Sequence, residues 1–171
     1  MCLPLMPMKC GRPARYLLAL LVAALVPSAA SAGIPDPLRF FEGRTESMAT
    51  MRIINRSPVV SRWVGYGTIK ADGSLQVVQH VNEQGRPDFD RWWQIREVGP
   101  DQFAGTMSEA TGPVTIERIG AAYRFRFRMK KNLSAEQWLT PLGETAARTR
   151  MTIRKFGVTV GHSEGWIRKM R

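Results

Sequence analysis

Cysteine and histidine are scarce in this sequence. Its 171 residues include two cysteines, Cys2 and Cys10, and two histidines, His80 and His162. Because both thiols lie in the first ten residues, a disulfide framework or a four-thiolate zinc site is excluded for everything downstream. The carboxylates are scattered one or two at a time, and no nucleophile–base pair is visible. We therefore expect no metal site, no cofactor and no enzymatic activity.

Long hydrophobic runs are missing too, apart from the eleven residues 16–26. Basic residues precede this run, and Pro27 and a group of small residues follow it. The run is too short to span a bilayer, which takes about 20 residues. The pattern predicts a signal peptide over residues 1–32, cleaved after Ala32, and so a periplasmic or secreted protein. An uncleaved N-terminal anchor is the alternative.

The expected mature domain, residues 33–171, lacks helix-period segments and alternates between apolar and polar residues instead. Asp72-Gly73 is a hairpin signal between two such runs. The segment 35–41 is expected to be an extended lead-in, and residues 133–143 to hold a short helical turn capped by Ser134. About nine strands are expected, over residues 45–55, 59–70, 75–83, 89–98, 102–109, 114–119, 123–130, 145–156 and 158–170. The fold class is all-β, a single antiparallel up-and-down β-barrel, because closure removes exposed sheet edges.

Three segments resemble a known family. They are residues 40–43 (Phe-Phe-Glu-Gly), residues 91–95 (Arg-Trp-Trp-Gln-Ile) and the terminal element 151–161, which contains Lys-Phe-Gly. Together they are similar to the domain of unknown function 3833, an uncharacterised proteobacterial family, and the resemblance spans residues 38–168. It implies a lipocalin-like barrel in the cell envelope and no established chemistry. Acidic residues expected before the terminal element are sparse here, so any acidic site of relatives is in doubt.

Tryptophan and phenylalanine on the apolar phase of the strands indicate a ligand pocket. A barrel of about eight strands either fills its interior or holds one small ligand. Gly65 and Gly67 indicate close backbone approach or strand bending, and they also leave room for a cavity. Arg62 or Tyr66 is expected at the mouth, although ordinary core packing is the alternative. The candidate pocket residues are Trp63, Gly65, Gly67, Trp93, Phe125, Phe127, Met151 and Trp166.

Basic side chains alternate with apolar ones on two late strands, 123–130 and 148–154. One face of each strand is apolar and the other is cationic. If the two strands are neighbours, the cations share one surface, which suits lipid headgroups, lipopolysaccharide phosphates or another acidic envelope polymer. A solvated face neutralised by acids from other strands is the alternative. The candidate anion-contact residues are Arg124, Arg126, Arg128, Lys130, Arg148, Arg150 and Arg154.

These patterns predict a non-enzymatic periplasmic barrel that holds a lipophilic small molecule or lipid tail, with its basic face toward an anionic envelope component. A structural module that docks an acidic partner or lipopolysaccharide is the second hypothesis. An envelope enzyme using Asp88, Asp90 or His162 is the third. We expect at most peripheral contact with a membrane, and export argues against nucleic acid as a partner despite the basic charge.

Overall fold

The computed structural model describes residues 36–170 of the chain. The predicted signal peptide, residues 1–32, and both cysteines lie outside the described residues. Within residues 36–170, no helix is long and apolar enough to cross a membrane.

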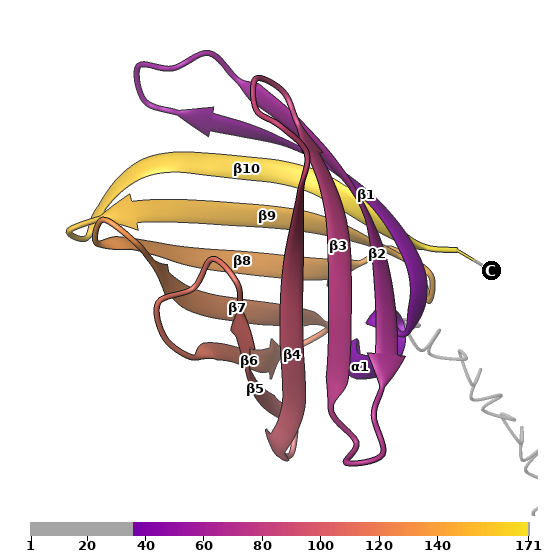
Figure 1. The fold of residues 1–171 in the computed structure, drawn as a ribbon. Coiled ribbons are helices and arrows are strands. Elements are labelled where there is room, and N and C mark those ends of the chain that lie inside the picture. Colours follow the sequence, from indigo (N-terminus) through magenta and orange to yellow (C-terminus); the bar gives the residue numbers. More distant parts are fainter. Residues whose placement is uncertain (1–35, 171) are drawn as a thin grey trace, which may run out of the picture. The chain divides into compact units, whose positions relative to one another are not determined.

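Ten antiparallel strands form one closed barrel in the order β1-β10-β9-β8-β7-β6-β5-β4-β3-β2 (Figure 1). Each strand pairs with its neighbours in sequence, and β1 pairs with β10 to close the ring. The predicted all-β up-and-down barrel is therefore confirmed, with one strand more than expected. The elements are α1 (Pro37–Phe41), β1 (Gly43–Ile53), β2 (Val59–Ile69), β3 (Leu75–Glu83), β4 (Phe89–Gly99), β5 (Gln102–Met107), β6 (Val114–Ile119), β7 (Ala122–Met129), β8 (Leu133–Pro141), β9 (Ala146–Lys155) and β10 (Val158–Lys169).

The additional strand is β8, where a helical turn was predicted. Ser134 does not cap a helix; it lies on β8 opposite Arg128 of β7 and Arg154 of β9. The inward residues of β8 alternate with outward ones, but Gln137 stands at an inward position, and this polar residue masks the period of two. The consequence is that β8 separates β7 from β9, so the two basic strands are not neighbours.

The prediction of an extended lead-in over residues 35–41 is also wrong. Residues Pro37–Phe41 form the short helix α1. Asp36 caps it, because its side-chain Oδ1 accepts a hydrogen bond from the Leu38 backbone N–H at 2.7 Å. Pro37 suits the first helical position, because a backbone N–H there would have no partner within the helix. Phe40 and Phe41 are both buried. Their rings pack edge to face, with 5.0 Å between the ring centroids.

The apolar core fills the end of the barrel that α1 covers. There the backbone of α1 approaches β2 so closely that a Cβ on Gly67 would lie 1.9 Å from the Phe41 carbonyl oxygen. Gly67 is thus the place where the helix rests on the sheet. The buried apolar residues of this core include Leu38, Phe40, Leu75, Ile95, Phe103, Ile116, Tyr123, Leu139, Ala147 and Ile167.

A Gly67→Ala substitution should destabilise the fold by about 1–3 kcal/mol, because the added methyl group overlaps the α1 backbone. Gly112→Ala is the matched control, since a Cβ there meets nothing within 4 Å. Urea unfolding of both variants measures the difference. Equal stability of the two variants would show that α1 does not rest on Gly67.

Candidate functional site

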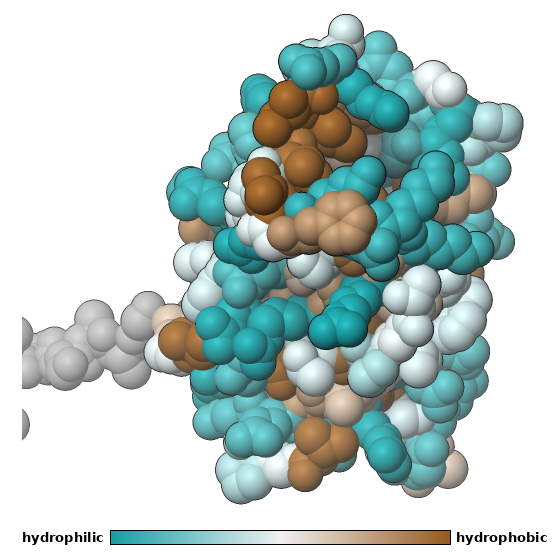
Figure 2. Space-filling model, turned by 90° about the vertical axis from the view of Figure 1, so that its left-hand side faces the viewer, coloured by the Kyte–Doolittle hydropathy of each residue, from teal (hydrophilic) through white to brown (hydrophobic). Residues whose placement is uncertain are grey.

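The two ends of the barrel differ in how well they are filled. At the end opposite α1, several inward-facing residues remain partly exposed although their strands are paired on both sides, whereas others there, such as Val81 and Ile153, are buried. This end carries the β1–β2 and β9–β10 links, on the left of Figure 1 and toward the viewer in Figure 2. We refer to this less completely buried part of the inner face, at the end opposite α1, as the cup, and to that end as the open end. The partly exposed inward residues include Met51, Trp63, Phe89, Arg91, Trp93 and Met151.

Trp93 packs on this inner face against two aromatic residues of β7. Its ring packs edge to face against Phe125 at 6.4 Å and Phe127 at 6.2 Å between centroids. Phe125 and Phe127 are buried in the core, whereas Trp93 and Met151 pack against it and stay partly exposed. Trp63 lies on the same inner face, opposite Ser47 and Val81. Five of the eight predicted pocket residues thus face the interior with their side chains.

Buried polar side chains also face the cup, and the sequence reasoning missed them as site residues. Trp93 Nε1 donates a hydrogen bond to Gln79 Oε1 at 3.1 Å. Ser47 is buried, and within residues 36–170 its hydroxyl is the one buried side-chain polar atom without a hydrogen-bond partner. The full set of buried polar residues on the inner face is Thr45, Ser47, Gln79, Thr149 and Ser163. For Gln79, the sequence does contain a signal of inward orientation, because this residue alternates in phase with the apolar residues of β3.

A charged pair lies near the open end. Arg91 occupies the inner phase of β4, opposite Gln79, and its Nε donates to the carboxylate of Glu109 in the β5–β6 link. Arg91 also lies over the Phe89 ring, 5.7 Å from its centroid. Lining of this composition, aromatic with buried hydroxyl and amide groups and a partly exposed guanidinium, suits a ligand that is mostly apolar but carries a polar group.

Three predicted pocket residues do not line the cup. Trp166 was placed in the apolar phase, but it pairs with Arg148 on the outer face, and the Arg168 guanidinium lies 5.1 Å from its ring centroid. Gly67 leaves no room because α1 occupies its space, and a Cβ on Gly65 would lie 2.7 Å from Thr45 Oγ1. The expectation that these glycines open a cavity is wrong. The other interpretation, close backbone approach, is correct for Gly67, where the α1 backbone lies against β2.

The two residues expected at the mouth also face outward. Arg62 and Tyr66 alternate with Trp63 and Gly65 along β2, and both are exposed. Tyr66 packs on the outer face against His80, with 5.9 Å between ring centroids.

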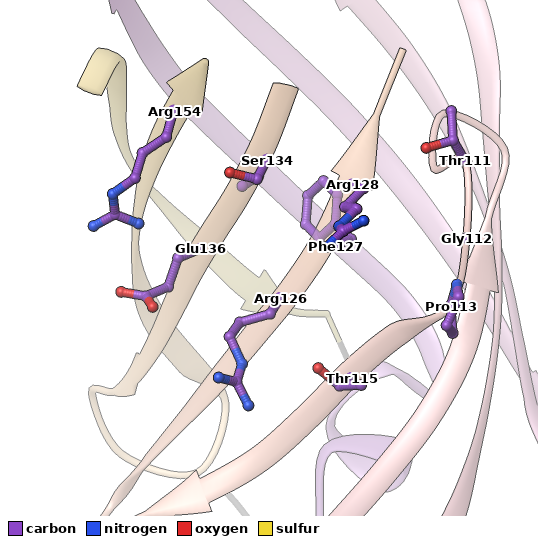
Figure 3. A pocket seen from close by; sticks show the side chains of 11 residues that line it. Thr111, Gly112, Pro113, Thr115, Arg126, Phe127, Arg128, Ser134, Glu136 and Arg154 are labelled. Carbon is purple, nitrogen blue, oxygen red and sulfur yellow. The ribbon is translucent and has the colours of Figure 1, made fainter. Parts of the chain in front are cut away.

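The basic residues of β7 and β9 face outward, with the outer face of β8 between them. Arg128, Ser134 and Arg154 form one row across the three strands. They border a groove of about 540 Å³, which Arg126, Glu136 and the β5–β6 link complete (Figure 3). Two guanidinium groups on either side of a hydroxyl can bind a phosphate or carboxylate through charge-assisted hydrogen bonds.

A second groove on the same face has a volume of about 470 Å³. Arg148, Arg150, Trp138 and Leu142 line it. Trp138 lies between Arg124 and Arg150 in the register, and the Arg124 guanidinium is 5.6 Å from its ring centroid. Lys130, the remaining member of the predicted face, is exposed in the β7–β8 link.

Acidic residues neutralise part of this surface. Glu117 of β6 pairs with Arg124 at 2.6 Å and Arg126 at 2.9 Å, and Glu164 of β10 pairs with Arg150 at 3.1 Å. The hydrogen bond from Arg124, aided by the charges of Arg124 and Arg126, holds the pKa of Glu117 below its usual value.

Four cations of the same surface are left over. Among the ion pairs of residues 36–170, none involves Arg128, Lys130, Arg148 or Arg154. The face is thus a mixture of neutralised and free cations.

The residues of the enzymatic hypothesis lie apart on the outer surface. Asp88 accepts a hydrogen bond from Asn82 Nδ2 at 2.8 Å, and Asp90 contacts His80 Nδ1 at 2.5 Å. His162 is exposed on β10, opposite Arg52 and Thr152. No hydrogen bond or ion pair within residues 36–170 joins His162 to either aspartate.

Comparison with solved structures shows the class of fold. An S-type phycobiliprotein lyase from Guillardia theta superposes with a TM-score of 0.64 at 8% sequence identity, covering 78% of this chain and 90% of the lyase. A protein of unknown function from the DUF3598 family of Nostoc punctiforme has a TM-score of 0.57 at 8% identity, covering 81% of this chain and 50% of that protein. The barrel is lipocalin-like.

The family is shown by sequence. The family model described as "Protein of unknown function (DUF3833)" matches residues 36–169. The chain belongs to this family, which confirms the resemblance inferred from its three segments. No curated protein matches the sequence.

Replacing Ser47 with Ala should leave the free energy of unfolding unchanged or raise it by up to about 1 kcal/mol, because no hydrogen bond within the barrel is lost. Gln79→Leu is the contrasting variant. It should cost about 1 kcal/mol or more, since the Trp93 indole N–H loses its acceptor. Denaturant unfolding compares the two. A larger loss for Ser47→Ala than for Gln79→Leu would contradict this description of the inner face.

Proposed function

We propose that this protein is a non-enzymatic binding protein that holds a small lipophilic molecule, or the tail of a lipid, in the open end of its barrel. The observation that carries the proposal is the partial exposure of apolar side chains on the inner face at that end. Trp63, Trp93 and Met151 face inward on paired strands and yet remain partly exposed. When an apolar ligand covers these side chains, it removes apolar surface from water, and this burial favours binding.

The proposed ligand also carries a polar group. The free hydroxyl of Ser47 and the amide of Gln79 face the same interior as Trp63 and Trp93. A buried polar atom without a partner is costly, and a ligand oxygen or nitrogen would satisfy it. The lipocalin-like fold supports this proposal, because barrels of this size can hold one small ligand.

A second part of the proposal concerns the outer surface and the compartment. We infer export to the periplasm from the predicted signal peptide, with the basic outer face directed to an anionic envelope component such as lipopolysaccharide. The specific support is the row Arg128, Ser134 and Arg154 along a groove of about 540 Å³. Neither Arg128 nor Arg154 takes part in an ion pair within residues 36–170.

The test of the first part is native mass spectrometry of the chain from Gly33, purified from its own envelope, followed by titration with fatty acids and phospholipids. A bound small molecule is expected. Trp63→Leu should weaken binding about tenfold, because an aromatic contact of roughly 1.4 kcal/mol is lost. Trp166→Leu on the outer face is the matched control and should bind like the parent chain. A chain that carries no ligand and ignores these lipids would overturn the proposal.

The test of the second part is binding to lipopolysaccharide. The pair Arg128→Gln and Arg154→Gln should lower affinity about thirtyfold at low salt, since each cation near an anionic surface contributes about 1 kcal/mol. High salt should reduce the difference. The pair Arg62→Gln and Arg96→Gln removes the same charge from the other side of the barrel. Equal losses in both double variants would assign the binding to net charge and not to the groove.

A further inference from the structure

The most exposed large apolar side chains of the described residues gather at the open end of the barrel. Phe156 is 76% exposed, Val158 66% and Ile54 62%. Phe156 forms the β9–β10 link with Gly157, and Val158 begins β10. Ile54 follows β1 directly, and its backbone N–H donates to the carbonyl of Val160, two residues after Val158, at 3.0 Å. Figure 2 shows apolar residues on this side of the molecule, surrounded by hydrophilic ones.

Phe156 is unfavourable for the fold in two ways. It exposes an aromatic ring to water, and its φ of 50° places a bulky residue in the left-handed region. Gly157 follows with a φ of 84°, so the link is a two-residue turn with both residues at positive φ. Asn-Gly is the pair that such turns prefer. A phenylalanine kept there at a cost in stability indicates a role outside the fold.

Basic residues surround this apolar tip. Lys155 lies 5.8 Å from the Phe156 ring centroid, and the neighbouring β7–β8 link contains Lys130 and Lys131. The β1–β2 link adds Arg56. None of these three links contains an acidic residue.

Charge also differs between the two ends of the barrel. The links at the open end contain four basic residues and two acidic ones, namely Arg56, Arg86, Lys130 and Lys131 against Asp88 and Glu109. The links between strands at the end that α1 covers contain one basic residue and three acidic ones, namely Lys70 against Asp72, Asp101 and Glu144. A molecule polarised in this way approaches an anionic surface with its open end first.

We propose that the open end docks on an anionic lipid bilayer, with Ile54, Phe156 and Val158 inserted among the acyl chains and the surrounding lysines and arginines at the headgroups. Exposed apolar side chains within a basic rim are the combination that peripheral membrane proteins use. A bilayer fits better than a protein partner because the three side chains lie on separate, exposed strand ends and form no groove of their own. Docking in this orientation turns the mouth of the cup to the source of a lipophilic ligand.

The test is co-sedimentation of the chain from Gly33 with vesicles of phosphatidylcholine containing phosphatidylglycerol, at low and high salt. This part contains the whole closed barrel and its core. Binding is expected to anionic vesicles and to fade with salt. Phe156→Asn should lower the vesicle affinity about tenfold. The same change should raise the midpoint of thermal unfolding, because it creates the preferred Asn-Gly turn, so weaker binding cannot be ascribed to misfolding.

Val98→Asn is the matched control, since Val98 is an exposed apolar residue on β4 away from the open end. It should bind vesicles like the parent chain. Ligand binding in the cup by native mass spectrometry should be unchanged in Phe156→Asn, which separates failure of this proposal from failure of the proposed function. Unchanged vesicle binding in Phe156→Asn overturns the proposal. A dimer that dissociates in Phe156→Asn, without vesicle binding, also overturns it and assigns the tip to self-association.

Discussion

Pairing of β1 with β10 is the contact on which the rest of the structure depends. It runs from Thr45 opposite Lys169 to Ile53 opposite Gly161 and closes the ring. Gly165 permits this approach, because a Cβ there would lie 2.2 Å from the Met48 carbonyl oxygen. Closure removes both sheet edges and gives every strand an inner and an outer face. All of the functional proposals rest on this division between inside and outside.

The inner face is unevenly filled along the barrel, and this unevenness separates stability from function. Near α1, residues such as Phe40, Leu75 and Tyr123 are almost fully buried and supply the apolar burial that stabilises the fold. Toward the other end, Trp63 remains partly exposed, and the Ser47 hydroxyl is buried without a partner. The closed end therefore supplies most of the burial that stabilises the fold, and the open end is where we propose that the ligand binds.

Much of the fold could be predicted from the sequence, because alternation and turn residues are local signals. The Asp72-Gly73 turn and the alternation along β7 are examples. The sequence does not reveal β8, because the polar residue Gln137 occupies one of its inward positions. The prediction that Trp166 faces inward is wrong because it rests on hydrophobicity alone, whereas the register places Trp166 opposite Arg148 on the outer face. Which strands are neighbours depends on every strand between them, so one unrecognised strand is enough to make the predicted order wrong. The Arg91–Glu109 pair likewise became visible only when the register was known.

The central claim is that the interior receives a lipophilic ligand through the end opposite α1. Its most direct test is the NMR spectrum of the five tryptophan indole N–H groups in the presence of a nitroxide-labelled fatty acid. The account predicts selective broadening of the Trp63 and Trp93 signals, while those of Trp92 and Trp166 stay sharp. Broadening confined to Trp92 and Trp166, with Trp63 and Trp93 unaffected, would contradict it.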